Sequence, residues 1–505
     1  MDVLSSLMLG FSVVFQPTNL FFCFLGVLIG TMVGVVPGLG VACTFSLLLP
    51  VTFHMEPVAA IIMLGGIYYG AQYGGSTTSI LVNIPGEATS VMTCLDGYQM
   101  ALQGRAGPAL GISAFGSFIA GTIGVVALMF LAPSLVGFAI KFGPPEYFSL
   151  VILGMTVLTF LTSTSMIRAM MMATFGLLLG TVGQDIISGI TRLTFNIPEL
   201  MDGIGIVPVV MGLFGISEVL LNVETKVKQR VFTGGKIKGF LPTLNDWKRS
   251  GGAIARGSVL GFLLGVLPGG GAVIASFASY AVEKMVSKHP ENFGKGAIEG
   301  VAGPESANNA ASSGAFVPLM TLGIPSNVPT AMLLAALIMY GITPGPLLLI
   351  QHPDIFWGVV ASMYVGNVML LVLNLPLIPL WIKLLKIPYT YLFPLIVLFC
   401  IIGAYSMNGS TFEVQIMLVF GIVGYLMRKL NLEIPPFVMA LVLGQMLEKT
   451  FRQSLIMSGG SLTIFFTRPI SATFIIIAIL LYVLPSIPGL GLRRPGSVLP
   501  ADDDD

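Results

Sequence analysis

The chain has 505 residues, of which 55% are hydrophobic and only 9% are charged. A soluble domain carries about 25% charged residues, so this composition excludes a soluble globular protein and indicates a polytopic membrane protein. The formal net charge of +1 gives no reason to expect a nucleic-acid partner. The four cysteines lack the spacing of a metal site, and we interpret them as small buried hydrophobic residues.

Apolar segments recur along the whole chain. About 20 apolar residues make one helical crossing, and on this basis we expect roughly 11 to 14 crossings. The predicted segments are 20–36, 41–53, 58–73, 110–132, 147–162, 166–183, 204–222, 252–267, 271–282, 327–345, 355–382, 389–403, 411–427, 434–447 and 471–490. Several are too short to cross alone. They favour broken helices or re-entrant hairpins buried in protein, because irregular backbone facing lipid would leave peptide groups unpaired.

Two glycine-rich segments repeat one design. FLGVLIGTMVGVVPGLG at 24–40 and ARGSVLGFLLGVLPGGG at 255–271 both carry glycine at every fourth position and end in Pro-Gly-x-Gly. An apolar run into Ile-Pro follows each of them, ILVNIPGE at 80–87 and MTLGIPSN at 320–327. Interrupted helices at corresponding positions of two halves are the best sequence indication of a transporter's substrate site.

The basic residues predict the topology. The longest polar stretch, 223–256, is strongly basic, and short basic loops stay in the cytoplasm. An odd number of segments separates the first glycine-rich span from its copy, so the copy should enter the membrane from the opposite side. We therefore predict an all-α fold of two inverted repeats. Its parts are a first transmembrane repeat at 1–222, a basic cytoplasmic linker at 223–251, a second transmembrane repeat at 252–450, and a C-terminal transmembrane helix with a polar tail at 451–505.

The two Pro-Gly-x-Gly breaks are candidates for a cation site. A broken helix frees carbonyl oxygens, which are the ligands that a hard cation such as sodium prefers. The candidate residues are Pro37, Gly38, Gly40, Pro268, Gly269, Gly270 and Gly271. Asn83, Asn308 or Asn309 could add a side-chain oxygen. The glycines that precede the breaks are interpreted as helix-packing positions, since GxxxG spacing is common in membrane bundles.

Small polar residues surround the Ile-Pro elements, without Arg, Lys or His. An anion could still bind there, because a restarting helix offers free N–H groups and a positive dipole end. The candidate substrate-binding residues are Ser76, Thr77, Thr78, Ser79, Asn83, Pro85, Gly86, Asn308, Asn309, Ser312, Ser313, Gly314, Pro325, Ser326 and Asn327. Packing explains glycines, but it does not explain a duplicated break followed by a duplicated polar cluster.

Glu305 stands just ahead of the Asn-Asn element and has two interpretations. An ionisable group inside the bilayer would be a candidate cation or proton site. Alternatively, Pro304 and Glu305 would suit the first turn of a helix at the water interface. The second interpretation is the one that the sequence favours.

Four motifs resemble the large membrane subunit of the tripartite tricarboxylate transporters of bacteria. They are GVVPGLG, YGGSTTSILVNIPGE with TCLDGYQMA behind it, GVLPGGGA, and PESANNAASSGAFVPLMTLGIPSN. The resemblance covers essentially the whole chain, and its departures at Gln99, Ser306 and Ser326 concern the substrate rather than membership.

The resemblance implies a multi-pass protein of the bacterial inner (cytoplasmic) membrane. Such a protein imports a di- or tricarboxylate, for example citrate, by secondary active transport coupled to sodium or protons. An elevator-type carrier is also implied. The implied partners are a small membrane subunit, a periplasmic solute-binding protein and the lipid bilayer, and a homodimer of the complex stays open.

The residues also bear on other classes of function. A carboxylate channel is the alternative to a carrier, because small polar linings and glycine kinks also suit a pore. The chain has no GxxxxGK[ST] loop and no HExxH motif, so neither ATP drive in this subunit nor an enzyme is expected. No cofactor is expected beyond the coupling ion.

Overall fold

A computed structural model describes residues 3–36, 39–161, 165–185, 187–224, 239–269, 271–384 and 389–483. Pro37, Gly38, Gly270, residues 225–238 of the predicted linker and residues 484–505 at the C-terminus lie outside these residues. The regular elements of the described part are helices and one small hairpin. In this hairpin the two-residue strand β1 (Gly183–Gln184) pairs antiparallel with the two-residue strand β2 (Thr191–Arg192). The predicted all-α class is confirmed, and the domain boundaries stay a prediction.

The first half of the chain contains ten α-helices among its described residues. They are α1 (Val3–Val14), α2 (Pro17–Val35), α3 (Val41–Thr52), α4 (Pro57–Val82), α5 (Val91–Leu102), α6 (Ala106–Ala139), α7 (Pro144–Leu161), α8 (Met166–Gly180), α9 (Ile206–Val210) and α10 (Ser217–Glu224). Shorter turns are η1 (Ala88–Ser90), η2 (Pro198–Leu200) and the π-helical η3 (Met211–Ile216).

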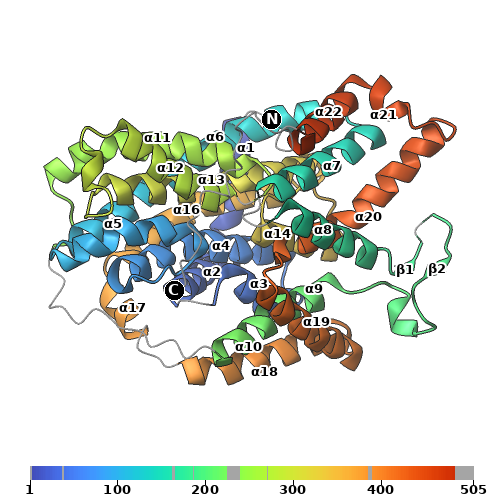
Figure 1. The fold of residues 1–505 in the computed structure, drawn as a ribbon, viewed down its shortest axis with the longest axis horizontal. Coiled ribbons are helices and arrows are strands. Elements are labelled where there is room, and N and C mark those ends of the chain that lie inside the picture. The colour runs from blue at the N-terminus through green and yellow to red at the C-terminus, as the bar shows by residue number, and fades with distance from the viewer. Residues whose placement is uncertain are drawn as a thin grey trace.

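The second half of the chain begins with α11. Its elements are α11 (Leu244–Val266), α12 (Gly271–Val286), η4 (Pro290–Asn292), α13 (Glu299–Leu322), α14 (Val328–Met339), α15 (Pro346–Gln351), α16 (Pro353–Asn374), α17 (Ile378–Leu384), α18 (Tyr389–Asn408), α19 (Thr411–Lys429), α20 (Ile434–Met457), α21 (Ile464–Thr467) and α22 (Pro469–Val483). In Figure 1, α18 and α19 lie along the lower edge, and the β-hairpin projects beyond α8 and α20.

Length and composition support a multi-pass membrane protein. Among the described residues, 5 helices are long and apolar enough to cross a membrane. They are Pro17–Val35, Ala106–Ala139, Ile206–Glu224, Pro353–Asn374 and Thr411–Lys429. Several shorter apolar helices accompany them, as the short predicted segments indicated.

The predicted spans are wrong about α13, which they omit. This helix has 24 residues, and its residues 300–321 are all buried although many are Ser, Asn, Gly or Pro. A span search finds helices by their apolar side chains, whereas α13 is enclosed by α6, α11 and α12, where small and polar residues are tolerated. The predicted spans also end α4 too early and omit the short helices α1 and α5.

The repeated glycines of α2 lie against the backbone of α4. An added Cβ at each of them would approach a carbonyl oxygen of α4 to 2.2–2.5 Å, which is too close for any side chain. The pairs are Gly26 with Met63, Gly30 with Ile67 and Gly34 with Ala71. The residue numbers of both members of the pairs increase together, so α2 and α4 pack parallel to one another.

The glycines of α11 lie against α13 in the same way. An added Cβ would approach a carbonyl oxygen of α13 to 2.2–2.5 Å. The pairs are Gly257 with Gly303, Gly261 with Ala307 and Gly265 with Ala311. The interpretation of these glycines as packing positions is therefore confirmed in both halves.

The two parallel pairs meet through α4 and α13, which run in opposite directions. Gly65 lies near the ring of Phe316, Tyr68 lies beside Ser312, and Ser76 lies beside Glu305. As the residue number increases along α4, the residue number of the contact in α13 decreases, so the two helices pack antiparallel. Large buried side chains including Tyr68, Phe316 and Phe356 make this contact part of the main core.

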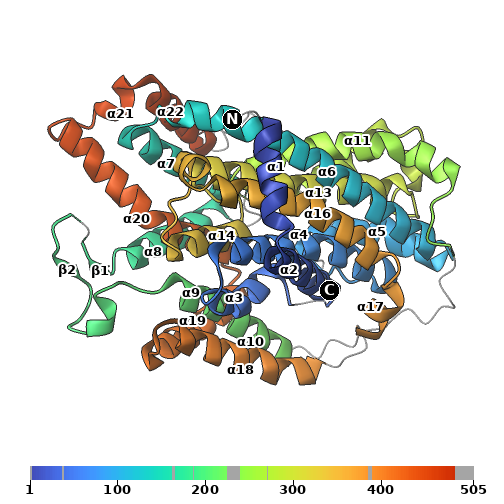
Figure 2. The same cartoon turned by 180° about the vertical axis from the view of Figure 1, so that it is seen from behind.

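Helix α1 covers the far side of this core. Figure 2 shows α1 crossing α16, and the contact is close because an added Cβ at Gly10 would lie 2.2 Å from the carbonyl oxygen of Trp357. A helix of the first half and a helix of the second half therefore pack into the same core.

Asp96, in the middle of α5, bonds to the segment that leads into α13. Its Oδ1 accepts hydrogen bonds from the backbone N–H groups of Gly294, Gly296 and Ala297 at 2.8–2.9 Å. Its Oδ2 accepts a hydrogen bond from the hydroxyl of Tyr280 at 2.8 Å. These bonds therefore connect α5 of the first half to the residues just before α13 of the second half.

Candidate functional site

The break in the second half is a connected structure around Gly269. Gly269 has a φ of +113°, and its N–H donates to the carbonyl of Ser326 at 2.8 Å. Asn327 caps α14 by accepting a hydrogen bond from the N–H of Thr330 at 3.0 Å. Its side-chain amide donates to the hydroxyl of Tyr68 at 2.7 Å. Helix α4 of the first half therefore reaches the break of the second half.

The break in the first half is built differently. Asn83 ends α4 in the left-handed region with a φ of +58°, and its side chain is exposed. Gly86 abuts α2, since an added Cβ there would lie 2.0 Å from the carbonyl oxygen of Gly34. The Glu87 carboxylate accepts a hydrogen bond from the N–H of Val41, the first residue of α3, at 2.9 Å. A carboxylate of the chain itself thus lies at this helix end.

One face of α13 carries Glu305, Asn308 and Ser312, which are three and four residues apart and so lie in one row. Glu305 and Asn308 are fully buried. Glu305 Oε1 accepts a hydrogen bond from the hydroxyl of Thr93 on α5. Glu305 Oε2 and both amide atoms of Asn308 have no hydrogen-bond partner among the described residues. The favoured interpretation of Glu305 as a carboxylate at the water interface is wrong, because α13 begins six positions earlier at Glu299.

The neighbouring row of α13 faces α6 instead. The Asn309 amide donates to the hydroxyl of Ser117 at 2.7 Å, and the Ser313 hydroxyl donates to the carbonyl of Gly121 at 3.3 Å. Gly314 lies against α11, with an added Cβ 2.6 Å from the carbonyl oxygen of Phe262. These three predicted site residues therefore have helix-packing partners.

The polar residues of α4 divide among three neighbours. The Thr78 hydroxyl donates to the carbonyl of Val35 on α2 at 2.6 Å, and the Ser79 hydroxyl donates to the Ser90 hydroxyl at 2.9 Å. The Ser76 hydroxyl donates to the carbonyl of Tyr73 at 2.7 Å, and Thr77 is buried next to it in the chain. They help to line a cavity of about 10 Å³, enough for one water molecule. Its other lining residues are Tyr73, Leu110, Ser113, Ala114 and Asn374.

The remaining break residues are placed as follows. Gly40 has a φ of +55° and is the N-cap residue of α3. Gly271 begins α12, and an added Cβ there would lie 2.3 Å from the carbonyl oxygen of Leu264, so α12 folds back closely on α11. Pro268 and Pro85 are half-buried, and Pro325 is buried.

Sequence reasoning missed Tyr68 and Thr93, which complete the polar cluster around α13. A signal for Tyr68 was present, since it stands in the run GGIYYG, where a phenol among glycines needs a buried partner. Thr93 belongs to the TCLDGYQMA motif, but nothing in its spacing indicated a contact with Glu305.

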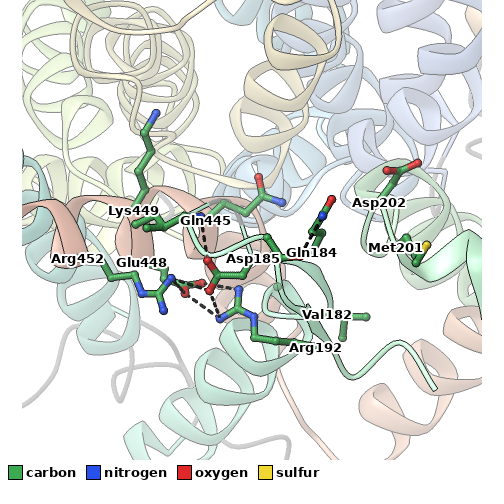
Figure 3. Close-up of a pocket in the computed structure, with 13 residues that line it drawn as sticks. Val182, Gln184, Asp185, Arg192, Met201, Asp202, Gln445, Glu448, Lys449 and Arg452 are labelled. Atoms are coloured by element: carbon green, nitrogen blue, oxygen red, sulfur yellow. Dashed lines mark hydrogen bonds and ion pairs between the residues drawn. The ribbon is translucent and has the colours of Figure 1, made fainter. Parts of the chain in front are cut away.

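A larger cavity of about 470 Å³ lies apart from these residues, between the β-hairpin and α20 (Figure 3). Four of its charged residues form ion pairs: Arg452 contacts Asp185 at 2.6 Å, and Arg192 contacts Glu448 at 2.8 Å. The backbone N–H of Ser188, then that of Ile187 and the Arg452 guanidinium, hold the pKa of Asp185 well below its usual range. None of the predicted site residues lines this cavity.

Interrupted helices that meet at a buried polar cluster, within a bundle of apolar helices, define a multi-pass membrane protein of the transporter class. Residues 20–439 match the model of the tripartite tricarboxylate transporter TctA family, and the chain belongs to this family. The resemblance found in the sequence is confirmed, as is the role of a component of this type of transporter.

Two relatives from Agrobacterium vitis are similar to the chain. An uncharacterized 52.8 kDa protein in the TAR-I ttuC' 3' region is 49% identical over 98% of both chains. An uncharacterized protein in the TAR-II ttuC' 3' region is 53% identical over 46% of this chain and 97% of its own length. No solved structure matches the chain.

Proposed function

We propose that the protein is the large membrane subunit of a secondary active transporter in the bacterial inner membrane. It imports a di- or tricarboxylate delivered by a periplasmic solute-binding protein, together with a small membrane subunit, and uses a sodium or proton gradient. The carrying observation is the hydrogen bond between Asn327, at the break of the second half, and Tyr68 on α4 of the first half. It joins the two halves at the interrupted helices.

An inverted repeat is part of this proposal. The parallel pairs α2–α4 and α11–α13 use the same glycine packing, and they oppose one another through the antiparallel contact of α4 with α13. Two repeats related by a pseudo-two-fold axis in the membrane plane would pack in this antiparallel way. The arrangement supports alternating access at a site between the halves.

An elevator movement is supported by how the outer helices pack. Helix α7 packs against α20 and α22, and α8 packs against α20. Helix α19 packs against α9, η3, α10 and α18. We propose that these outer helices form the static scaffold and that the units built on α4 and α13 move with the substrate.

The proposed substrate site lies at the second break. Tyr68, Ser312, Ser326 and Asn327 offer hydroxyl and amide donors there, and the Ser326 hydroxyl has no hydrogen-bond partner among the described residues. The start of α14 adds a positive dipole end worth about 0.3–1 kcal/mol. Because Glu87 already caps α3, we place the substrate carboxylates at the second break rather than symmetrically at both. Such a site binds weakly, which explains why a separate binding protein would capture the substrate.

The test is uptake of radiolabelled di- and tricarboxylates into proteoliposomes that contain this chain, the small subunit and the binding protein. Asn327→Ala should lower uptake roughly tenfold, because it removes a hydrogen bond at the site. Asn309→Ala is the matched control and should keep most uptake, since Asn309 faces α6. Equal uptake by Asn327→Ala and wild type would contradict the site. Accumulation against a gradient separates a carrier from a channel, and absence of carboxylate uptake by the wild type would contradict the function.

A further inference from the structure

The buried carboxylates of the described residues differ in how their charge is compensated. Four of them contact an arginine: Glu146 with Arg468, Asp185 with Arg452, Asp246 with Arg105, and Glu283 with Arg256. Asp96 has no arginine but accepts four hydrogen bonds.

Glu305 is the exception in this group. It is fully buried, it accepts one hydrogen bond, from Thr93, and its Oε2 has no partner among the described residues. A buried carboxylate with neither a cation nor a full set of donors is costly, because desolvation is not repaid. Among the described residues, Glu305 therefore has neither a cation beside it nor a full set of hydrogen-bond donors.

Asn308 provides a second, independent observation. It lies one turn after Glu305 on the same face of α13, it is fully buried, and neither of its amide atoms has a partner among the described residues. By contrast, the adjacent Asn309 amide is satisfied by Ser117. Buried amides are normally hydrogen-bonded, so an unpartnered one beside an uncompensated carboxylate indicates a missing ligand.

We propose that Glu305 and Asn308 bind one sodium ion between α13, α4 and α5. The Glu305 carboxylate and the Asn308 carbonyl oxygen are hard ligands of the kind that such a cation prefers. Thr93 bonds to this carboxylate and Ser76 lies beside it, so their hydroxyl oxygens complete an oxygen-rich shell. The site replaces the backbone carbonyls of the Pro-Gly-x-Gly breaks as the place of the coupling ion.

Helix α13 links this ion to the proposed substrate. The Ser312 hydroxyl donates to the Asn308 carbonyl at 3.0 Å, and Ser312 lies beside Tyr68, which bonds to Asn327. From Glu305 to Ser312 the helix rises by about 10 Å. Sodium would fix this face of α13 against α4 and so favour the arrangement that holds the substrate. This coupling role rests on the proposed function, whereas sodium binding itself does not.

The first experiment measures sodium binding to the purified chain with its small subunit and without any carboxylate. Thermal unfolding is followed in sodium chloride and in choline chloride at equal ionic strength, together with binding of radioactive sodium. The wild type should bind sodium and gain thermal stability specifically in sodium. Glu305→Gln and Asn308→Ala should weaken sodium binding at least tenfold, and Asn309→Ala should not. Both variants are first checked for a single monodisperse species, so that the folded Asn308→Ala serves if Glu305→Gln fails to fold.

Two outcomes would overturn the sodium site. One is a wild type whose unfolding temperature is the same in sodium chloride and in choline chloride, or changes only with the pH. The other is a folded Glu305→Gln or Asn308→Ala protein that binds sodium like the wild type. Sodium binding with no carboxylate uptake would instead contradict the proposed function and leave the site standing, so the two failures are distinguishable.

Discussion

The Glu87 carboxyl group accepts a hydrogen bond from the N–H of Val41 at 2.9 Å, and so caps the start of α3. The corresponding part of the second half has Asn327, which caps α14 and donates to Tyr68. The two breaks are thus similar in sequence but chemically unequal. A carboxyl group lies at one helix start, and a neutral amide lies at the other.

Loss of the Glu87 cap should destabilise the protein modestly. Glu87→Ala removes the acceptor of the Val41 N–H bond, and a hydrogen bond of this kind contributes about 0.5–1.5 kcal/mol. Thermal unfolding in detergent measures the effect. Glu56→Ala is the control, because Glu56 precedes α4 without a side-chain capping bond and is exposed. An equal or larger loss in the control would refute the capping role.

Gly261→Ala should be strongly destabilising. Its Cβ would lie 2.2 Å from the carbonyl oxygen of Ala307, so α11 and α13 would have to separate, at about 1–3 kcal/mol. Gly137→Ala in α6 is the matched control, since nothing lies within 4 Å of its added Cβ. Unfolding temperatures of the two variants in the same detergent decide the prediction, and equal values would show that the close α11–α13 contact does not exist.

Asp96→Asn should disrupt the segment before α13. A neutral amide replaces a carboxylate that accepts three backbone N–H bonds and one hydroxyl bond, and each hydrogen bond to a charged group contributes about 1.5–3 kcal/mol. Hydrogen exchange of residues 293–300 should rise. Tyr280→Phe removes a single bond and should give a much smaller rise. Unchanged exchange in Asp96→Asn would mean that this anchor is not formed.

The Asp185 anchor of the β-hairpin should resist mild acid. Its pKa is held well below the usual range by the N–H groups of Ser188 and Ile187 and by Arg452. A carboxyl group with a lowered pKa stabilises the folded state fully above its unfolded pKa of about 3.9, and that contribution is lost as the pH falls through the lower folded value. Proteolysis of the hairpin should therefore stay slow from about pH 7 to about pH 4.

Two substitutions separate the contributions of Asp185 and Glu448 to the ion pairs of the hairpin. Asp185→Asn should open the hairpin to protease at neutral pH, whereas Glu448→Gln should have little effect because the contact of Arg452 with Asp185 remains. Opening of the wild-type hairpin near pH 5 would contradict the lowered pKa.

Local sequence was sufficient for the features that depend on the backbone alone. Glycine and proline act on their own segment, so the motifs predicted helix breaks at Pro85 and Pro325, and α4 and α13 do end shortly before these prolines. The four-residue glycine spacing also predicted close helix packing, because residues at this spacing share one face of a helix. Composition alone determined the membrane class.

Only the tertiary structure decided what the polar side chains do. Asn308 and Asn309 are adjacent and chemically identical, yet the Asn308 amide has no partner in the described part of the chain and the Asn309 amide bonds to Ser117 on α6. The helix turns by about 100° between them, so the neighbours of each depend on which helices pack there. Burial of Glu305 was likewise invisible in the sequence, because it results from α4, α5 and α6 closing around α13 and not from any residue beside it in the chain.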